Sequence, residues 1–210
     1  MSEERIARRK SQLGKKCQPK QQRSRQRRTE IMLAAASLLE KVGFDDLTTT
    51  LIARELNISV GSLYHYFPHK QAILHAIGEY WLEEYTSTMQ EIAEADLEMM
   101  TVTQFCQHCV EQLLQVYREQ RGVLPLVHAM NAVPELRDLD AHHDELVIAL
   151  LAPMFARLGI SGGQQEHQRR ARLWLEMTHA LLLSIVLQTP SQARKSQTDL
   201  KRLGVTLLSD

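Results

Sequence analysis

The stretch from Leu47 to Lys70, LTTTLIARELNISVGSLYHYFPHK, constrains the fold of this chain more than any other part of it. Apolar residues recur at helical spacing between positions 47 and 56, which predicts a short amphipathic helix. The hydroxyls of Thr48 and Thr49 are placed to cap its first turn. Asn57, directly after it, is typical of a helix end.

A second short helix is expected close behind the first. Ser59 is its predicted N-cap and positions 60–66 its body, and the link of positions 57–59 permits only a tight turn between crossed helices. The second helix combines small and hydrogen-bonding residues, with Leu63 and Phe67 to anchor it. Such a helix can read DNA with its N-terminal residues, or it can pack closely on a neighbouring helix. We favour DNA reading, because the helix carries two tyrosines and lies near a basic segment.

The order and spacing of these residues resemble the DNA-binding domain of the TetR family of transcriptional regulators. Two segments carry the resemblance: Leu-Thr-Thr-x-x-Ile-Ala at positions 47–53, and Ser-Val-Gly-Ser-Leu-Tyr-x-Tyr-Phe-Pro-x-Lys at positions 59–70. The match extends from about Thr29 to Trp81. The resemblance implies a three-helix DNA-binding unit, followed by a larger helical domain that binds a ligand and forms a dimer.

Carried over position by position, the resemblance implies two kinds of DNA contact. Val60, Gly61 and Tyr64 are expected to face base edges. The expected phosphate contacts are Thr49, Ser62, His65, Tyr66 and Lys70, and Thr50 can serve either purpose.

The charge of the chain is unevenly distributed, although its net charge is zero. Positions 1–28 hold eleven Lys or Arg against two Glu, a net charge of +9. Positions 1–24 also lack apolar periodicity, which predicts a disordered basic arm. The arm can follow DNA phosphates or enter a minor groove, and the alternative is a solvated tail that keeps the protein soluble. Arg25 and Arg28, just after the arm, are expected to contact DNA.

Apolar residues at helical spacing predict helices through the rest of the chain. A helix from Thr29 to Val42, ended by Gly43, should support the helix-turn-helix. His69 departs from the family pattern, which usually has Ser, Asn or Asp there, so a weaker cap is expected for the next helix, which runs to about Ala93. In the family this helix links ligand binding to the DNA-binding domain.

Further helices are expected at about 102–117, 134–158, 164–188 and 196–208. Pro153 should bend or break the second of these. The helix at 164–188 is apolar around most of its circumference, so one side needs a partner chain. In the family the last two long helices form a four-helix dimer interface, which agrees with this pattern.

The expected ligand-binding residues are mostly aromatic or thiol side chains. They are Trp81, Tyr85, Phe105, Cys109, Tyr117, His128, Met130 and Trp174. For Trp81 and Tyr85, an ordinary place in the core is an equal alternative. The acidic surplus at positions 71–145 could indicate a cationic ligand, but charged residues normally lie on solvent faces.

Two groups of possible metal ligands are better explained otherwise. Cys106 and Cys109 share an apolar helix face while His108 points away, so they cannot converge on one metal ion. We favour buried thiols in the core, with redox or electrophile sensing as the alternative. His142 and His143 lie among acidic residues, and a solvated helix surface is favoured over a divalent-ion site.

The sequence therefore predicts an all-α protein with a basic arm at 1–24, a helix-turn-helix DNA-binding domain at 25–70, and a helical ligand-binding and dimerisation domain at 71–210. We expect a homodimeric repressor that binds a palindromic double-stranded DNA operator and responds to an unidentified small-molecule effector. The alternative is a non-specific or architectural DNA-binding protein that uses the basic arm. No catalytic motif, metal or cofactor is predicted. Three cysteines without a disulfide pattern, and no apolar N-terminal segment, favour the cytoplasm and no membrane partner.

Overall fold

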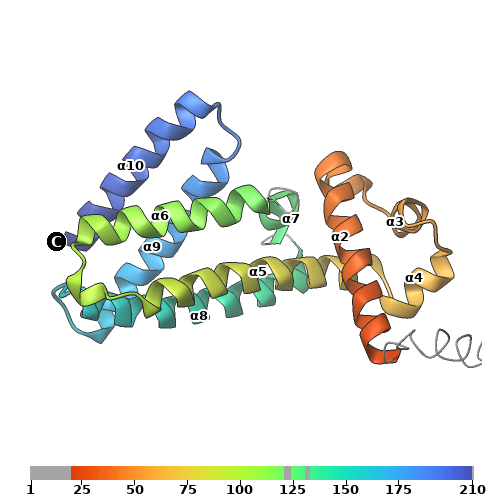
Figure 1. Ribbon diagram of the computed structural model, residues 1–210, viewed down its shortest axis with the longest axis horizontal. Helices are drawn as coiled ribbons and strands as arrows, with labels where there is room; N and C mark the ends of the chain where they lie inside the picture. The colour runs from red at the N-terminus through yellow and green to blue at the C-terminus, as the bar shows by residue number, and fades with distance from the viewer. Residues whose placement is uncertain (1–19, 121–123, 131–132, 210) are drawn as a thin grey trace, which may run out of the picture.

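A computed structural model describes residues 20–120, 124–130 and 133–209, and every regular element in these ranges is helical. The helices are α2 (Lys20–Asp46), α3 (Thr49–Glu55), α4 (Val60–Tyr66), α5 (Lys70–Glu94), the short 3-10 helix η1 (Leu97–Met99), α6 (Val102–Glu119), α7 (Leu124–Ala129), α8 (Pro134–Arg157), α9 (Gln164–Ile185) and α10 (Pro190–Ser209). Helices α2, α3 and α4 form a small unit at one end, and the helices from α5 onward form a body at the other (Figure 1). The predicted all-α fold is confirmed.

Helix α2 differs from its prediction at its start. It begins at Lys20 rather than Thr29, so the expectation that the chain is disordered to about Ser24 is wrong for positions 20–24. These residues are Lys, Gln, Arg and Ser, and the first three are strong helix formers, although they give no apolar periodicity. Positions 1–19 of the expected arm lie outside the described residues. At the other end Gly43 leaves the helical conformation, with φ of 80°, as expected.

Helix α5 joins the small unit to the body. Its buried side runs along its whole length, from Ile73 to Ile92, and it packs against α2 at one end and against α6 and α8 further along. In Figure 1 it extends from the small unit to the far end of the body. Its N-cap is His69, whose Nδ1 accepts a hydrogen bond from the Ala72 N–H at 3.1 Å. The imidazole thus takes the place of the usual oxygen acceptor, and the helix start is capped; that this cap is weaker stays a prediction.

Helix α8 lies against both α5 and α9. It continues through Pro153 to Arg157, so the helix is not broken at this proline, although a break was one expected outcome. Arg157 fastens its end to the end of α5: the guanidinium donates hydrogen bonds to the carbonyls of Ala93 and Ala95 and to the Glu98 carboxylate. The hydrogen bond from Arg157 lowers the pKa of Glu98 to about 2.

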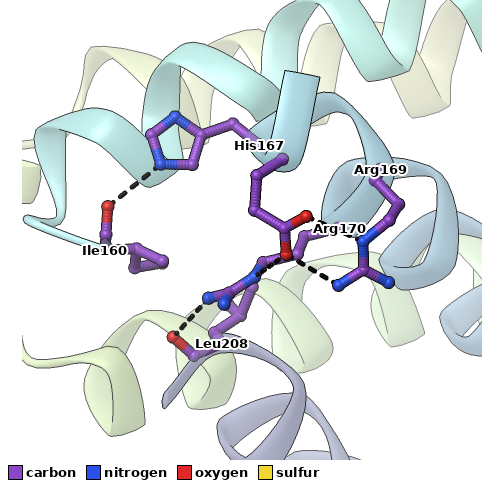
Figure 2. A network of polar contacts seen from close by, with 6 residues as sticks. Ile160, His167, Arg169, Arg170 and Leu208 are labelled. Carbon is purple, nitrogen blue, oxygen red and sulfur yellow. Dashed lines mark hydrogen bonds and ion pairs between the residues drawn. The ribbon is translucent and has the colours of Figure 1, made fainter. Parts of the chain in front are cut away.

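Helices α9 and α10 pack on each other and on α6. Helix α9 ends at Ile185, three residues before its predicted end, and α10 begins at Pro190, six residues before its predicted start. A buried polar network joins them, in which Arg170 donates from Nε to Glu166 at 2.8 Å and from Nη1 to the Leu208 carbonyl at 3.4 Å (Figure 2). The network fixes the C-terminal end of α10 against the start of α9.

None of the helices in the described ranges combines the length and the apolar character that crossing a membrane requires.

The contact between α9 and α10 depends on a glycine. A Cβ at position 204 would lie 2.5 Å from Trp174 Cζ3 and 3.3 Å from Cys106 Sγ. We expect Gly204→Ala to lower the free energy of unfolding by about 1–3 kcal/mol, because overpacking outweighs the better helix propensity of alanine. Urea denaturation at equal protein concentration measures this. Gly163→Ala is the control, since a Cβ there meets nothing within 4 Å. Equal stability of the Gly204 variant and the wild type would contradict the packing.

Candidate nucleic-acid interface and internal cavity

A tight corner between α3 and α4 sets the direction of α4. Thr48 Oγ1 accepts a hydrogen bond from the Leu51 N–H at 3.1 Å, and Ser59 Oγ accepts one from the Ser62 N–H at 3.0 Å. Both helices therefore begin with their predicted caps. Asn57 has a left-handed backbone, with φ of 51°, which asparagine tolerates better than most residues. The predicted helix-turn-helix is confirmed.

Helix α4 buries one side and exposes the other. Leu63 and Phe67 are buried in the core of the small unit, as expected. Tyr64 is 47% exposed, and its hydroxyl lies 3.2 Å from Thr49 Oγ1 on α3. Two residues expected to contact DNA, one on each helix, thus share one surface.

The other predicted contacts of this unit are also accessible. Gly61, Ser62, His65, Thr50 and Arg25 are exposed, and Val60 and Tyr66 are half-buried. Exposure is a requirement for contact with DNA, and the contacts themselves stay a prediction.

Arg28 has partners within the protein. Its Nη1 donates a hydrogen bond to the Tyr66 carbonyl at 3.1 Å, and its guanidinium carbon lies 4.3 Å from the centre of the Phe67 ring. Both contacts hold the C-terminal end of α4 against α2, and a cation near carbonyls at a helix C-terminus is favourable. Arg28 therefore positions α4 in the free protein.

Lys70 is similarly engaged. Its Nζ donates a hydrogen bond to the Phe44 carbonyl at 2.8 Å and lies 5.1 Å from the centre of the Phe44 ring. The carbonyl belongs to the residue that follows the break at Gly43, so Lys70 ties the end of α2 to the start of α5. We infer that Lys70 stabilises the small unit, whether or not it also reaches a phosphate.

A cavity of about 100 Å³ lies between α5, α8 and α9. Trp81 and Tyr85 from α5 form an aromatic wall, with ring centroids 6.0 Å apart. His143 from α8 packs edge-on against Tyr85 at 5.3 Å, and His179 from α9 packs edge-on against Trp81 at 6.0 Å. Tyr117 from α6 packs edge-on against Trp81 and Tyr85, and its hydroxyl lies 2.6 Å from His179 Nδ1.

Carboxylates line the rest of this cavity. Asp140 and Asp144 come from α8, and Glu176 comes from α9 together with Leu175. Burial raises the pKa of Asp140, and the charge of Asp144 raises it further. Burial also raises the pKa of Tyr85, which keeps its hydroxyl protonated.

The structure brings some of the predicted ligand-binding residues together and separates others. Trp81 and Tyr85 line the cavity, and Tyr117 contacts them. Phe105 and Trp174 instead pack on each other, with ring centroids 5.8 Å apart, and they do not line the cavity. Cys109 and Met130 are buried and do not line it either, and the side chain of His128 lies outside the described residues.

Most of the polar residues that line the cavity are not predicted from the sequence. His143 is only 6% exposed, so the expected solvated surface is wrong for it, although His142 is exposed as expected. The spacing held a signal: positions 140, 143 and 144 share one helix face, as do positions 175, 176 and 179 on α9. This spacing predicts a shared cavity only when it is already known that the two helix faces contact each other.

The described residues offer no site for a metal ion. They contain no group of three or more His, Cys, Asp or Glu that could hold one. Cys106 and Cys109 are buried free thiols on the inner face of α6, as expected for core residues.

The sequence also matches two family models. Residues 31–77 match bacterial regulatory proteins of the tetR family, and residues 101–208, half of the chain, match the tetracyclin repressor-like C-terminal domain. The chain belongs to the TetR family. This TetR-family protein is therefore a DNA-binding transcriptional regulator, as predicted, and the architectural alternative is not favoured.

Solved structures of other TetR regulators share the fold. Salmonella enterica GusR is 23% identical, with a TM-score of 0.65, and the match covers 87% of this chain and 95% of that one. A regulator from Haloarcula marismortui is 19% identical, with a TM-score of 0.67 and coverage of 86% and 95%. A regulator from Streptomyces coelicolor is 15% identical, with a TM-score of 0.68 and coverage of 87% and 80%. No curated protein sequence matches this chain.

The role of Lys70 in this TetR-family protein can be measured without DNA. We expect Lys70→Ala to lower the free energy of unfolding by about 1–2 kcal/mol, because a half-buried hydrogen bond from a charged group is lost. Denaturation in urea measures the change, and Lys41→Ala is the control because Lys41 is an exposed lysine of α2. A Lys70 variant as stable as the wild type would mean that this lysine is free for phosphate.

The two thiols of α6 should be unreactive in the folded protein. Burial raises the pKa of Cys106 to about 12 and that of Cys109 well above its usual value. The thiolate is the reactive form, so at pH 8 both thiols should escape iodoacetamide until urea unfolds the chain. Mass spectrometry of the labelled peptides gives the result. Rapid labelling of either thiol in the native protein would favour redox or electrophile sensing instead.

Proposed function

We propose that this protein is a homodimeric repressor that binds a palindromic operator and is released from it by a small-molecule effector. The observation that carries the proposal is the exposed polar face of α4, held by the buried Leu63 and Phe67 beneath it. One such helix from each subunit would enter successive major grooves of one duplex. Two identical subunits related by two-fold symmetry require a palindromic site.

We assign a role to each part of the chain from the arrangement of its helices. We assign DNA binding to positions 25–70 and effector binding and dimerisation to positions 71–210, with positions 1–24 as a basic arm. The arm would add affinity that depends on salt and little on sequence. We place the protein in the cytoplasm, where its DNA target would lie. The matched family is one of regulatory proteins, and we propose no catalytic role.

Exposed apolar residues on α9 and α10 support the dimer. Leu173 is 44% exposed and Leu203 is 49% exposed. Leu173 belongs to α9 and Leu203 to α10, the two helices that we propose pack against a second copy. Burial of the exposed half of each side chain would contribute about 1 kcal/mol, which favours association.

The cavity beside Trp81 supports the proposal that an effector binds to this protein. It lies within the body, and two of its wall residues belong to α5, the helix that also contacts the small unit. A ligand that favours one position of α5 would change the separation of the two copies of α4. Its effect on DNA affinity cannot exceed the difference between its affinities for the two positions.

Selection of bound duplexes from a random pool tests the proposal. The expected winner is a palindrome with half-sites about 10 base pairs apart, or a multiple of that spacing. Binding of random duplex as tight as that of any selected sequence would favour the architectural alternative, and an asymmetric winner would contradict the symmetric dimer.

Substitution of Tyr64 is the most direct single test of which surface reads the DNA. Tyr64→Ala should weaken binding to the selected operator by about 1–3 kcal/mol and relax the preference at the base pairs that it contacts. Titration of operator and of single-base variants by fluorescence anisotropy measures both effects. Met99→Ala is the control, since Met99 is also exposed and apolar but lies in η1, in the body. Unchanged discrimination in the Tyr64 variant would mean that another surface reads the DNA.

A further inference from the structure

Three carboxylates line the cavity without a strong cation among the other residues that line it. Asp140, Asp144 and Glu176 contribute to the wall, and no Lys or Arg of the described chain does. Arg172, on the same helix as Glu176, is paired with Glu145 at 2.6 Å. Burial and the charges of Asp144 and Glu176 raise the pKa of Asp140, and only His143 acts in the opposite direction.

The aromatic wall opposite favours positive charge as well. Trp81 and Tyr85 are almost completely buried, and both line the cavity. The face of an aromatic ring attracts a cation, and tryptophan does so most strongly. The attraction increases as the cation is removed from water, and Trp81 and Tyr85 form the buried side of this cavity.

A buried histidine nitrogen gives an independent indication of a ligand. His143 lines the cavity and is 6% exposed, and its Nε2 has no hydrogen-bond partner in the described part of the chain. Its Nδ1 lies 3.9 Å from Asp144 Oδ1, which is too far for a hydrogen bond. In the neutral tautomer with the proton on Nδ1, Nε2 is an acceptor, and an unpaired buried acceptor is costly unless a donor meets it.

The size of the cavity restricts the ligand. An apolar cavity of about 150 Å³ can hold benzene, so a volume of about 100 Å³ suits a molecule smaller than benzene. Carboxylates and an imidazole nitrogen all accept hydrogen bonds, so the charged end should carry N–H groups.

We propose that the effector of this protein is a small protonated amine, held in the cavity by Asp140, Asp144 and Glu176 around its ammonium group, with Trp81 and Tyr85 against its carbon chain and His143 Nε2 as a further acceptor. The proposal rests on the effector role assigned above. The proposal adds the chemical class of the ligand, a cation, which we infer from the negative charge of the residues that line the cavity.

Isothermal titration calorimetry of the full-length protein at neutral pH, without DNA, tests the class of ligand. The probes are n-butylammonium, butan-1-ol and butyrate, which share a chain and carry a positive, a neutral and a negative end. We expect n-butylammonium to bind at least about tenfold more tightly than butan-1-ol, and butyrate not to bind. Equal binding of the amine and the alcohol, or no binding of the amine at millimolar concentration, would overturn the proposal.

Two matched variants locate the site. Asp140→Asn removes a carboxylate from the cavity, and Asp138→Asn removes an exposed one from the same helix. We expect the first to reduce the preference for n-butylammonium over butan-1-ol about tenfold and the second to leave it unchanged. Thermal unfolding of both variants confirms that they are folded. An equal preference in the two variants would place the amine elsewhere and contradict the proposal.

Failure of this inference is distinguishable from failure of the proposed function. A protein that selects a palindrome but shows no preference for the amine keeps its assignment as a repressor and loses only the class of effector. A protein that prefers the amine but selects no sequence keeps the ligand site and loses the proposed operator.

Discussion

The seven residues of α4 are too few to form a stable helix on their own, so every DNA-reading role depends on what holds them in place. Burial of Leu63 and Phe67 supplies most of that support, and the Ser59 cap supplies the first turn. Arg28 then anchors the last turn from the side of α2. The exposed residues are free to differ in chemistry because the buried ones fix the geometry. This is why a small number of apolar positions can support an almost entirely polar outer face.

Helix α5 connects this support to the rest of the molecule. Lys70 contacts the end of α2, and Trp81 lines the cavity eleven residues later, about 16 Å along the helix. Between them Gly78 allows α8 to approach: a Cβ there would lie 3.2 Å from the side chain of Leu139. A change in how α5 packs against α8 at the cavity would therefore be transmitted along one continuous helix. Interfaces packed this closely tend to shift between discrete arrangements rather than deform gradually.

The sequence predicted what depends on neighbouring residues and missed what depends on distant ones. The caps at Thr48 and Ser59, the stop at Asn57 and the break at Gly43 follow from local chemistry, and all four are confirmed. No local pattern shows that the carbonyls of Phe44 and Tyr66 accept hydrogen bonds from Lys70 and Arg28, whose expected DNA contacts stay predictions. His143 looked solvated because its neighbours in sequence are acidic, whereas its environment is set by Tyr85 on another helix. The DNA contacts themselves stay a prediction, since they depend on a partner molecule.

Hydroxyl-radical footprinting of the selected duplex, with the number of bound chains measured by native mass spectrometry, tests the central claim most directly. That claim is that two copies of α4, each held by its own small unit, read successive major grooves of one duplex. The account predicts two chains per duplex and two protected half-sites related by two-fold symmetry. One chain per duplex, or protection that spreads evenly along the DNA, would contradict it.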